Sequence, residues 1–305
     1  MILVAGGTSR LGTSMVPRLL EHGLRLRILT RNPARAQQRW DDEVEIVQGD
    51  VRDPVILARA AQGVETVISA IHGFAGEGKV SPRSIDWEGN RNLIRAAEGA
   101  GVSHFILVSI SGASADHPME LFRMKYQAET ALQRSGLAWT IIRPTAYMEL
   151  WASMIGEPLL KTGKTRVFGR GNNPINFVSI QDVARFVELA VTTETMRGEI
   201  VEVGGPENLT MNEVAEAFQR ESGTAGRISH IPLPMMRVMA RVMAPINAQV
   251  ARQIGAGVVM DTTDVTFDGS ETARRHPAIT PTRFEDVIRR LSGDQPSARN
   301  LVTKP

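Results

Sequence analysis

The sequence predicts an α/β protein built on a doubly wound parallel sheet, followed by a smaller and mostly helical C-terminal subdomain on the substrate side. Short runs of Val, Ile and Leu alternate with amphipathic stretches through the first two thirds of the 305 residues. This alternation is typical of strand–helix–strand units. A glycine-rich turn follows the first apolar run, and the alternation fades after about residue 205.

Seven apolar runs are expected to form the strands of the sheet, with helices between them. Strands that are buried on both faces read as short, continuous apolar segments. The expected strands are Ile2–Ala5, Leu24–Thr30, Val44–Gln48, Thr66–Ala70, Phe105–Ser109, Trp139–Arg143 and Ile200–Val203.

Several helix ends carry recognisable signals. Asp53 followed by Pro54 predicts an N-cap and a first-turn proline, and Gly63 predicts a left-handed stop. The segments 179–182 and 210–213 have capping-box spacing before apolar periodic runs. Asp182 is therefore expected to be a helix-start carboxylate rather than a catalytic one.

The loss of strand–helix alternation after about residue 205 suggests where the chain divides into domains. Residues 1–205 are expected to form the sheet domain, with a substrate-side insertion near 147–176. Residues 206–291 are expected to form the smaller subdomain, which closes with a helix near Phe284–Leu291. The polar segment 292–305 contains two prolines and is expected to be a flexible tail.

Composition excludes several classes of function. A net charge of +2 is too small to argue for nucleic-acid binding or for an anionic membrane. The absence of cysteine excludes disulfides and thiolate metal sites. The six histidines show neither pairing at i, i+4 nor a carboxylate cluster at ligand spacing, so no metal is expected.

Localisation follows from similar arguments. Strand-like sequence begins at residue 2, and no apolar run approaches the length that spans a membrane. We therefore expect a cytoplasmic protein with a small-molecule substrate and with no nucleic-acid or membrane partner. The oligomeric state stays open.

The turn after the first strand reads GGTSRLG over residues 6–12 and leads into a helix that runs to Glu21. Glycines there allow a tight turn and a close approach of a pyrophosphate to the helix N-terminus, as in Rossmann folds. A plain loop is the alternative, but the complete strand–turn–helix–strand setting favours dinucleotide binding. The candidate cofactor-binding residues of this turn are Gly6, Thr8, Ser9, Arg10, Leu11 and Gly12.

The end of the second strand indicates which dinucleotide binds. NAD-specific sites place an acidic residue there, whereas this strand is followed by Arg31 and Asn32. A guanidinium can pair with a 2′-phosphate, and Arg10 projects from the same end of the sheet. The expected cofactor is therefore NADP. The alternative is that Arg31 is one more surface arginine.

With these residues in view, the chain resembles the atypical and extended short-chain dehydrogenase/reductases, and most closely the NmrA-like group of NADP-binding proteins. The motifs that carry the resemblance are VAGGTSRLG (4–12), LTRNP (29–33), GDVRD (49–53), VISA (67–70), IDWEGNRNLIRAA (85–97), FILVS (105–109), KYQAE (125–129), TIIRP (140–144) and FVSIQDVA (177–184). The resemblance implies that Asp50 and Val51 flank the adenine. It places Ser69, Ala70 and Ile71 along the nicotinamide–ribose path and Pro144 and Thr145 near the nicotinamide.

The family turn usually has glycine at the position of Ser9. A Cβ there narrows the approach to the phosphates, although the hydroxyl can donate to one of them instead.

The resemblance also implies that Lys125 binds the nicotinamide ribose, with a further option that it acts as the acid, as in isoflavone-reductase-like relatives. Standard members carry a tyrosine four residues before this lysine, but Leu121 stands there. Tyr126 is rotated by about 100° from Lys125 on a helix and does not replace it. On spacing alone, a solvated lysine paired with Glu129 is the favoured interpretation.

Two further residues are candidates for catalysis. Tyr147 follows the RP pair at the expected mouth of the site, where it is either a proton donor or an aromatic wall. Ser109 ends a sheet strand where related enzymes keep a serine that orients a carbonyl. His72 follows the expected active-site edge, but a loop-surface histidine is the favoured interpretation.

Residues 234–243 place apolar side chains at helical spacing with arginines between them. A membrane-surface helix is one interpretation. A helix packed over the substrate cleft, with its arginines in solvent, is the simpler one. Pro245 is expected to end or kink it.

These observations lead to one main hypothesis and two alternatives. The main hypothesis is an NADPH-dependent reductase of a small apolar carbonyl, quinone or activated alkene that lacks the standard tyrosine. The first alternative is a non-catalytic NADP-binding protein that reports redox state to a partner. The weaker alternative is a nucleotide-sugar epimerase or dehydratase, which Leu121 opposes.

Overall fold

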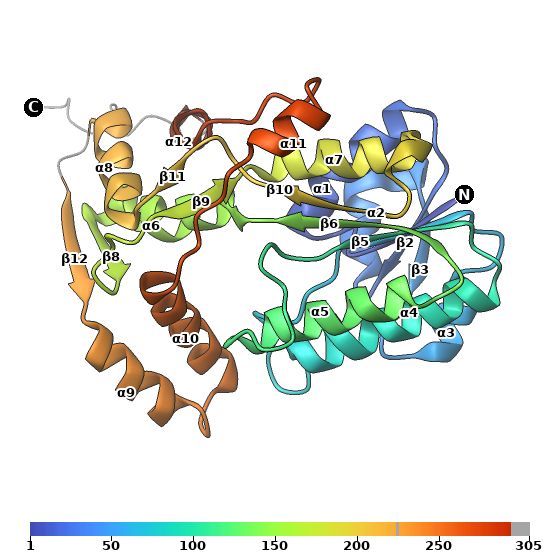
Figure 1. Cartoon of the computed structure of the whole chain (residues 1–305), viewed down its shortest axis with the longest axis horizontal. Helices are drawn as coiled ribbons and strands as arrows, with labels where there is room; N and C mark the ends of the chain where they lie inside the picture. The colour runs from blue at the N-terminus through green and yellow to red at the C-terminus, as the bar shows by residue number, and fades with distance from the viewer. Residues whose placement is uncertain (224–225, 294–305) are drawn as a thin grey trace, which may run out of the picture.

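The computed structural model describes residues 1–223 and 226–293. A seven-stranded parallel sheet forms its centre, with the strand order β3-β2-β1-β4-β5-β6-β10 (Figure 1). The strands are β1 (Ile2–Ala5), β2 (Leu26–Thr30), β3 (Glu45–Gln48), β4 (Thr66–Ser69), β5 (His104–Val108), β6 (Ala138–Pro144) and β10 (Glu199–Val203). All seven predicted strands are confirmed to within two residues at each end.

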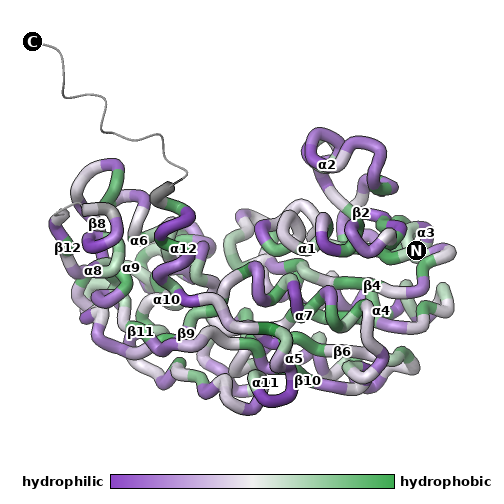
Figure 2. Tube along the Cα trace, turned by 90° about the horizontal axis from the view of Figure 1, so that it is seen from above, coloured by the Kyte–Doolittle hydropathy of each residue, from purple (hydrophilic) through white to green (hydrophobic). Residues whose placement is uncertain are grey.

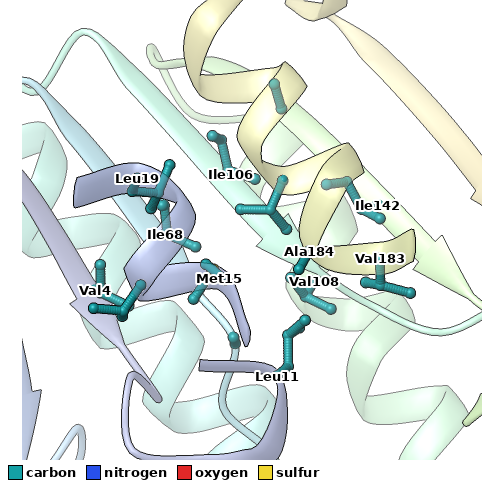
Figure 3. Packing of buried hydrophobic residues seen from close by; sticks show 14 of the residues in the cluster. Val4, Leu11, Met15, Leu19, Ile68, Ile106, Val108, Ile142, Val183 and Ala184 are labelled. Carbon is teal, nitrogen blue, oxygen red and sulfur yellow. The ribbon is translucent and has the colours of Figure 1, made fainter. Parts of the chain in front are cut away.

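Helices cover both faces of this sheet (Figure 1). One face packs against α1 (Arg10–Glu21), α2 (Pro33–Trp40) and α7 (Ile180–Thr192), and the other against α3 (Pro54–Ala60), α4 (Glu88–Gly99) and α5 (Glu120–Gln133). Alternate strand residues point to opposite faces, so Val4 lies under α1 while Leu3 belongs to the other core (Figure 3). The predicted doubly wound architecture is confirmed.

Short helical pieces interrupt this pattern at three places. They are η1 (Asp41–Glu43), the π-helical turn η2 (Arg83–Trp87) and η3 (Glu194–Met196). The π-helical turn leads directly into α4 and carries Asp86. Such turns occur frequently at functional sites.

A third core gathers segments that are distant in sequence. It contains Phe177, Phe218 and Phe284 and joins α6 (Met148–Thr162), α8 (Met211–Ser222) and α12 (Phe284–Gly293). Two small sheets complete it. They are formed by β11 (Asn208–Leu209), β9 (Ile175–Val178) and β7 (Ala146–Tyr147), and by β12 (Arg227–Ile231) with β8 (Lys164–Phe168). Seen from above, α8, α12 and β12 lie at one side and α1 and α2 at the other (Figure 2).

The predicted helix signals are mostly confirmed. The Asp53 side chain accepts hydrogen bonds from the N–H groups of residues 55 and 56, and Gly63 has a φ of 69°. Thr210 and Glu213 form the expected capping box. The closing helix α12 begins at Phe284 as predicted, whereas most of the expected tail, 294–305, lies outside the described residues.

Asp182 lies in the first turn of α7 as expected, but it does not close a capping box. Its carboxylate accepts hydrogen bonds from the N–H and the hydroxyl of Thr282, at 2.7 and 2.8 Å. Ser179 caps the helix through the N–H of Gln181, and the Glu149 carboxylate accepts from the N–H of Ile180 at 2.9 Å. The buried Asp182 therefore ties α7 to the segment before α12, which is a structural role.

Residues 234–243, whose apolar side chains have helical spacing, lie in α9 (Leu233–Met243), which ends before Pro245 as predicted. It is followed by α10 (Ala248–Thr262) and α11 (Ser270–Arg275). The expected packing of α9 over the substrate cleft is wrong. Met236 is buried, but the other large apolar side chains of α9 are mostly exposed, because α10 occupies the position nearer to the sheet (Figure 1).

His104 provides a test of the sheet that depends on pH. Its Nε2 donates to the Thr140 hydroxyl at 3.0 Å, and that hydroxyl donates to the Met196 carbonyl. Burial and, to a smaller extent, the charge of Arg197 together lower the pKa of His104 from 6.5 to about 4. The unfolded chain therefore takes up a proton at a higher pH than the native chain does.

Acid should thus destabilise the native state through His104. Between pH 6.5 and pH 4 the free energy of unfolding is expected to fall by about 3 kcal/mol from this residue alone. Urea unfolding of the wild type and of His104→Gln across this range measures the effect. Equal pH slopes for the two proteins would contradict it.

Candidate functional site

The candidate site lies at the carboxyl edge of the sheet, where the glycine turn meets the end of β4. Gly6 has a φ of +94°, and a Cβ on it would lie 2.4 Å from the Ala70 carbonyl oxygen. A Cβ on Gly12 would lie 2.0 Å from the Gly7 carbonyl oxygen. The turn is therefore packed too tightly for side chains at these two positions.

The remaining residues of the turn differ in how far their side chains are buried. Ser9 is the N-cap of α1, and its Oγ accepts a hydrogen bond from the Gly12 N–H at 3.0 Å. A serine hydroxyl that accepts one bond can still donate its hydrogen to a ligand. Leu11 is buried in the core, so it would contribute its backbone N–H rather than its side chain (Figure 3). Thr8 is partly buried.

Charged residues gather where β2 and β3 end. Arg31 is exposed there, and Asn32 caps α2 by accepting from the Arg35 N–H at 3.1 Å. Asp50 accepts from Nε and Nη2 of Arg52 at 2.8 and 2.7 Å. These bonds hold the pKa of Asp50 below its ordinary value, and the charge of Arg31 acts in the same direction.

Sequence reasoning missed Arg52, although it stands two residues after Asp50 in the GDVRD motif. A groove lined by Arg31, Gly49 and Ile56 runs beside this cluster. Arg10 faces elsewhere: its Nη1 donates to the Glu149 carbonyl at the start of α6, at 3.3 Å.

The residues at and after the end of β4 form hydrogen bonds inside the protein. Ser69 is fully buried, and its hydroxyl donates to Asn90 Oδ1 at 2.5 Å. The Ala70 N–H donates to the Ala5 carbonyl at 2.9 Å, which continues the pairing of β1 with β4. Val51 is buried against Gly89. These side chains shape the floor of the site rather than offering free polar groups.

Lys125 is buried, with 4% of its surface exposed. Its Nζ donates to the carbonyls of Ile71 and Val108, both at 2.9 Å, and lies 3.2 Å from Asp86 Oδ1. Asp86 is fully buried, and its Oδ2 accepts from the Gly73 N–H at 2.8 Å. Burial raises the pKa of Asp86, while Lys125 opposes the shift.

This arrangement excludes a solvated Lys125–Glu129 pair. Lys125 connects the ends of β4 and β5 to the π-helical turn before α4. Sequence reasoning missed Asp86, although it lies in the 85–97 motif; the Asn90 amide donates to its backbone carbonyl at 2.7 Å.

Ser109 and Glu129 belong to a second buried network. The Ser109 hydroxyl donates to Glu129, whose carboxylate also accepts from Nε and Nη2 of Arg143 at 3.0 and 2.6 Å. Arg143 Nη1 reaches Glu202 at 3.0 Å. The Ser109 hydroxyl is therefore bound inside the protein.

Tyr147 lies between β6 and α6 and is partly buried. Burial raises the pKa of its phenol, and the nearby charge of Glu149 raises it further. A phenol that holds its proton more tightly is a weaker acid, so this environment favours the aromatic wall over the proton donor.

Pro144 and Thr145 follow the same strand. The Thr145 hydroxyl donates to Asn176 Oδ1 at 3.0 Å, and the same oxygen accepts from the Gly205 N–H at 2.9 Å. Asn176 is a buried residue that sequence reasoning missed, and it fixes the chain beyond β6 and β10.

His72 is exposed at this edge, whereas the backbone of both neighbouring residues is hydrogen-bonded inside the protein. The Ile71 carbonyl accepts from Lys125, and the Gly73 N–H donates to Asp86. The imidazole of His72 is therefore presented by a fixed backbone.

The described residues contain neither a metal-ligand cluster nor a membrane-spanning helix. No group of three or more His, Cys, Asp or Glu residues within 1–223 and 226–293 is arranged to hold a metal ion. In the same residues, no helix has the length and hydropathy needed to cross a bilayer.

The sequence matches the NmrA-like family over residues 1–274. The chain belongs to the NmrA-like family. This family member is 30% identical to the photosystem II assembly factor Ycf39 of Synechocystis sp., over 78% of this chain and 72% of that protein. It is also 30% identical to an NAD(P)H azoreductase of Xenophilus azovorans, over 76% of this chain and 78% of that protein.

The fold of this NmrA-like chain is also found in solved structures. The NADPH-dependent quinone oxidoreductase QOR2 of Escherichia coli, complexed with NADPH, superposes with a TM-score of 0.78 at 22% identity. The superposition covers 95% of this chain and 99% of that one. The resemblance predicted from the sequence motifs is confirmed.

The buried Lys125–Asp86 pair gives a test of the site's construction. Removing one partner of a buried ion pair typically costs about 3–5 kcal/mol, because the other charge is left without compensation. Lys125→Met and Asp86→Asn should each lower the free energy of unfolding by about this amount. The double variant should lose clearly less than the sum of the two.

Urea unfolding of the four proteins measures the coupling. Lys161→Met serves as a control, because Lys161 forms an exposed i, i+4 pair with Glu157 and should change the stability by less than about 1 kcal/mol. Strict additivity of the two single changes would show that Lys125 and Asp86 do not act as a pair.

Proposed function

We propose that this NmrA-like protein is an NADPH-dependent reductase of a small apolar quinone, activated alkene or carbonyl compound. The observation that carries the proposal is the packing of the glycine turn against the end of β4. There the strand order reverses between β1 and β4, and ligands of doubly wound sheets bind at such points. Glycines at positions 6 and 12 keep the turn tight, because a Cβ at either would meet backbone atoms. A tight turn at the N-terminus of α1 suits a dinucleotide pyrophosphate.

Within this proposal, the pyrophosphate lies against the N–H groups of the first turn of α1, with the Ser9 hydroxyl as a further donor. Arg31 holds the 2′-phosphate, since a guanidinium stands at the end of β2 where NAD-specific sites carry an acid. Asp50 and Val51 flank the adenine, and residues 69–71 line the path of the nicotinamide ribose. NADPH, when bound, supplies a hydride at this edge.

Two named relatives support the cofactor assignment. One is described as an NAD(P)H azoreductase, and the QOR2 structure contains NADPH. The azoreductase is 30% identical to this chain, whereas QOR2, at 22% identity, is similar in fold.

The proposed substrate class depends on which side chains of the site can donate a proton to the substrate. Lys125 and Ser109 are bonded within the protein, and the pKa of Tyr147 is raised. Reduction of a plain ketone needs a proton close to the developing alkoxide. A quinone or an activated alkene spreads the incoming charge by conjugation, so it depends less on a positioned acid.

A redox sensor is the second candidate function. The same internal bonding of Lys125 and Ser109 favours it, because a binding protein needs no proton donor. The Ycf39 relative is described as an assembly factor rather than as an enzyme. An epimerase or dehydratase stays the weakest alternative, because Leu121 occupies the usual tyrosine position.

Turnover distinguishes the two main candidates. NADPH oxidation, followed at 340 nm with quinones, enones and ketones, should be fastest with the first two classes. Tyr147→Phe should keep the rate within a few-fold, since the phenol acts as a wall. Loss of a hundredfold or more would make Tyr147 the acid instead. Tight NADPH binding without oxidation by any acceptor would favour the sensor.

A further inference from the structure

Helix α9 presents a continuous apolar stripe on the surface of the molecule. The exposed fractions are 48% for Met235, 58% for Val238, 40% for Met239 and 57% for Val242. Ile246, in the turn that follows, is 71% exposed. The four helical positions follow the i, i+3, i+4, i+7 pattern and so lie within an arc of about 100°.

The stripe faces away from the protein. On the opposite side of α9, Met236 is buried and lies close to Gly257 of α10. Helix α10 continues toward the sheet domain, where Arg252 Nη2 donates to the Gly76 carbonyl at 2.7 Å (Figure 1). Gln249 donates to the Ala75 carbonyl at 2.9 Å. The stripe therefore belongs to the outer helix of a hairpin whose inner helix is fastened to the loop after β4.

The charge beside the stripe has one sign. The segment from residue 226 to residue 260 contains four arginines and no acidic residue. The net charge of the whole chain, by contrast, is only +2. Arg237 and Arg241 lie on α9 itself and are exposed. Neither forms a salt bridge with the residues that the structure describes. On the helix both arginines lie on the same flank, about 60° (Arg241) and about 100° (Arg237) beyond the edge of the stripe at Val238.

We propose that α9 docks the protein peripherally on the surface of an anionic phospholipid bilayer. The helix lies parallel to the membrane plane, with the apolar stripe and Ile246 among the upper acyl chains. Arg237 and Arg241 reach up to the lipid phosphates beside it. The helix has 11 residues, which is far too short to span a bilayer, so the attachment is to one leaflet.

The charge argues for lipid rather than for a second copy of the chain. A two-fold contact through the stripe would bring the arginines of both copies together without an acid nearby in the segment to compensate them. An anionic bilayer satisfies both the apolar and the basic part of the surface. The proposal does not depend on the proposed reductase activity.

The test is co-sedimentation of the full chain with vesicles. Vesicles of phosphatidylcholine with 30–50% phosphatidylglycerol, roughly the charge density at which basic helices bind, should sediment the protein, and pure phosphatidylcholine should sediment little. Salt should weaken the binding. The double variants Val238→Asp/Val242→Asp and Arg237→Glu/Arg241→Glu should each reduce the bound fraction at least about fivefold.

Val55→Asp is the matched control, because Val55 is 79% exposed on α3, in the sheet domain. It should bind vesicles as the wild type does, and unchanged melting temperatures would show that all variants fold. Vesicle binding that survives both α9 changes would overturn the proposal. So would a dimer by light scattering that only Val238→Asp/Val242→Asp dissociates, without vesicle binding.

Discussion

The close approach of β1 and β4 at their carboxyl ends is the constraint on which the rest of the site depends. The backbone at Gly6 lies so near the Ala70 carbonyl that no side chain fits between them. From the other face, Lys125 and Asp86 hold the segment that continues β4, through the Ile71 carbonyl and the Gly73 N–H. The edge that would receive a dinucleotide is therefore fixed from both faces before any ligand binds, which lowers the entropic cost of binding.

The polar residues that looked catalytic serve mainly to build this edge. Lys125 joins two strand ends to the π-helical turn, and Ser109 is bound to Glu129 in the network of Arg143. Because buried charges must be paired, these networks cannot be loosened without a large loss of stability. The groups that the edge offers to a ligand are the Ser9 hydroxyl, Arg31 at the end of β2 and the exposed His72. That set suits the binding and orientation of a dinucleotide better than the delivery of a proton.

The sequence was sufficient for the sheet, because each buried strand reads as a local apolar run between recognisable helix signals. It was also sufficient for the turn that carries Gly6 and Gly12, because glycines between an apolar run and a helix are a recognisable signal. It did not reveal β7, β8, β9, β11 or β12, which are short and pair with segments far along the chain. Nor did it reveal the partners of Lys125. The choice of Asp86 over Glu129 depends on a π-helical turn that changes which side chains face α5. For α9, the apolar periodicity predicted the helix but not which side of it is exposed. That side is decided by α10, which covers Met236, and the position of α10 is a property of the tertiary structure.

Calorimetric titration with NADPH and with NADH tests the central claim most directly, that the chain binds a phosphorylated dinucleotide at this edge. The wild type should bind NADPH at least about tenfold more tightly than NADH, as expected for one charge-assisted contact to the 2′-phosphate. Arg31→Ala should abolish that preference, whereas Arg39→Ala, a change at an exposed arginine of α2, should keep it. No heat of binding with either nucleotide, or a preference for NADH in the wild type, would contradict the account.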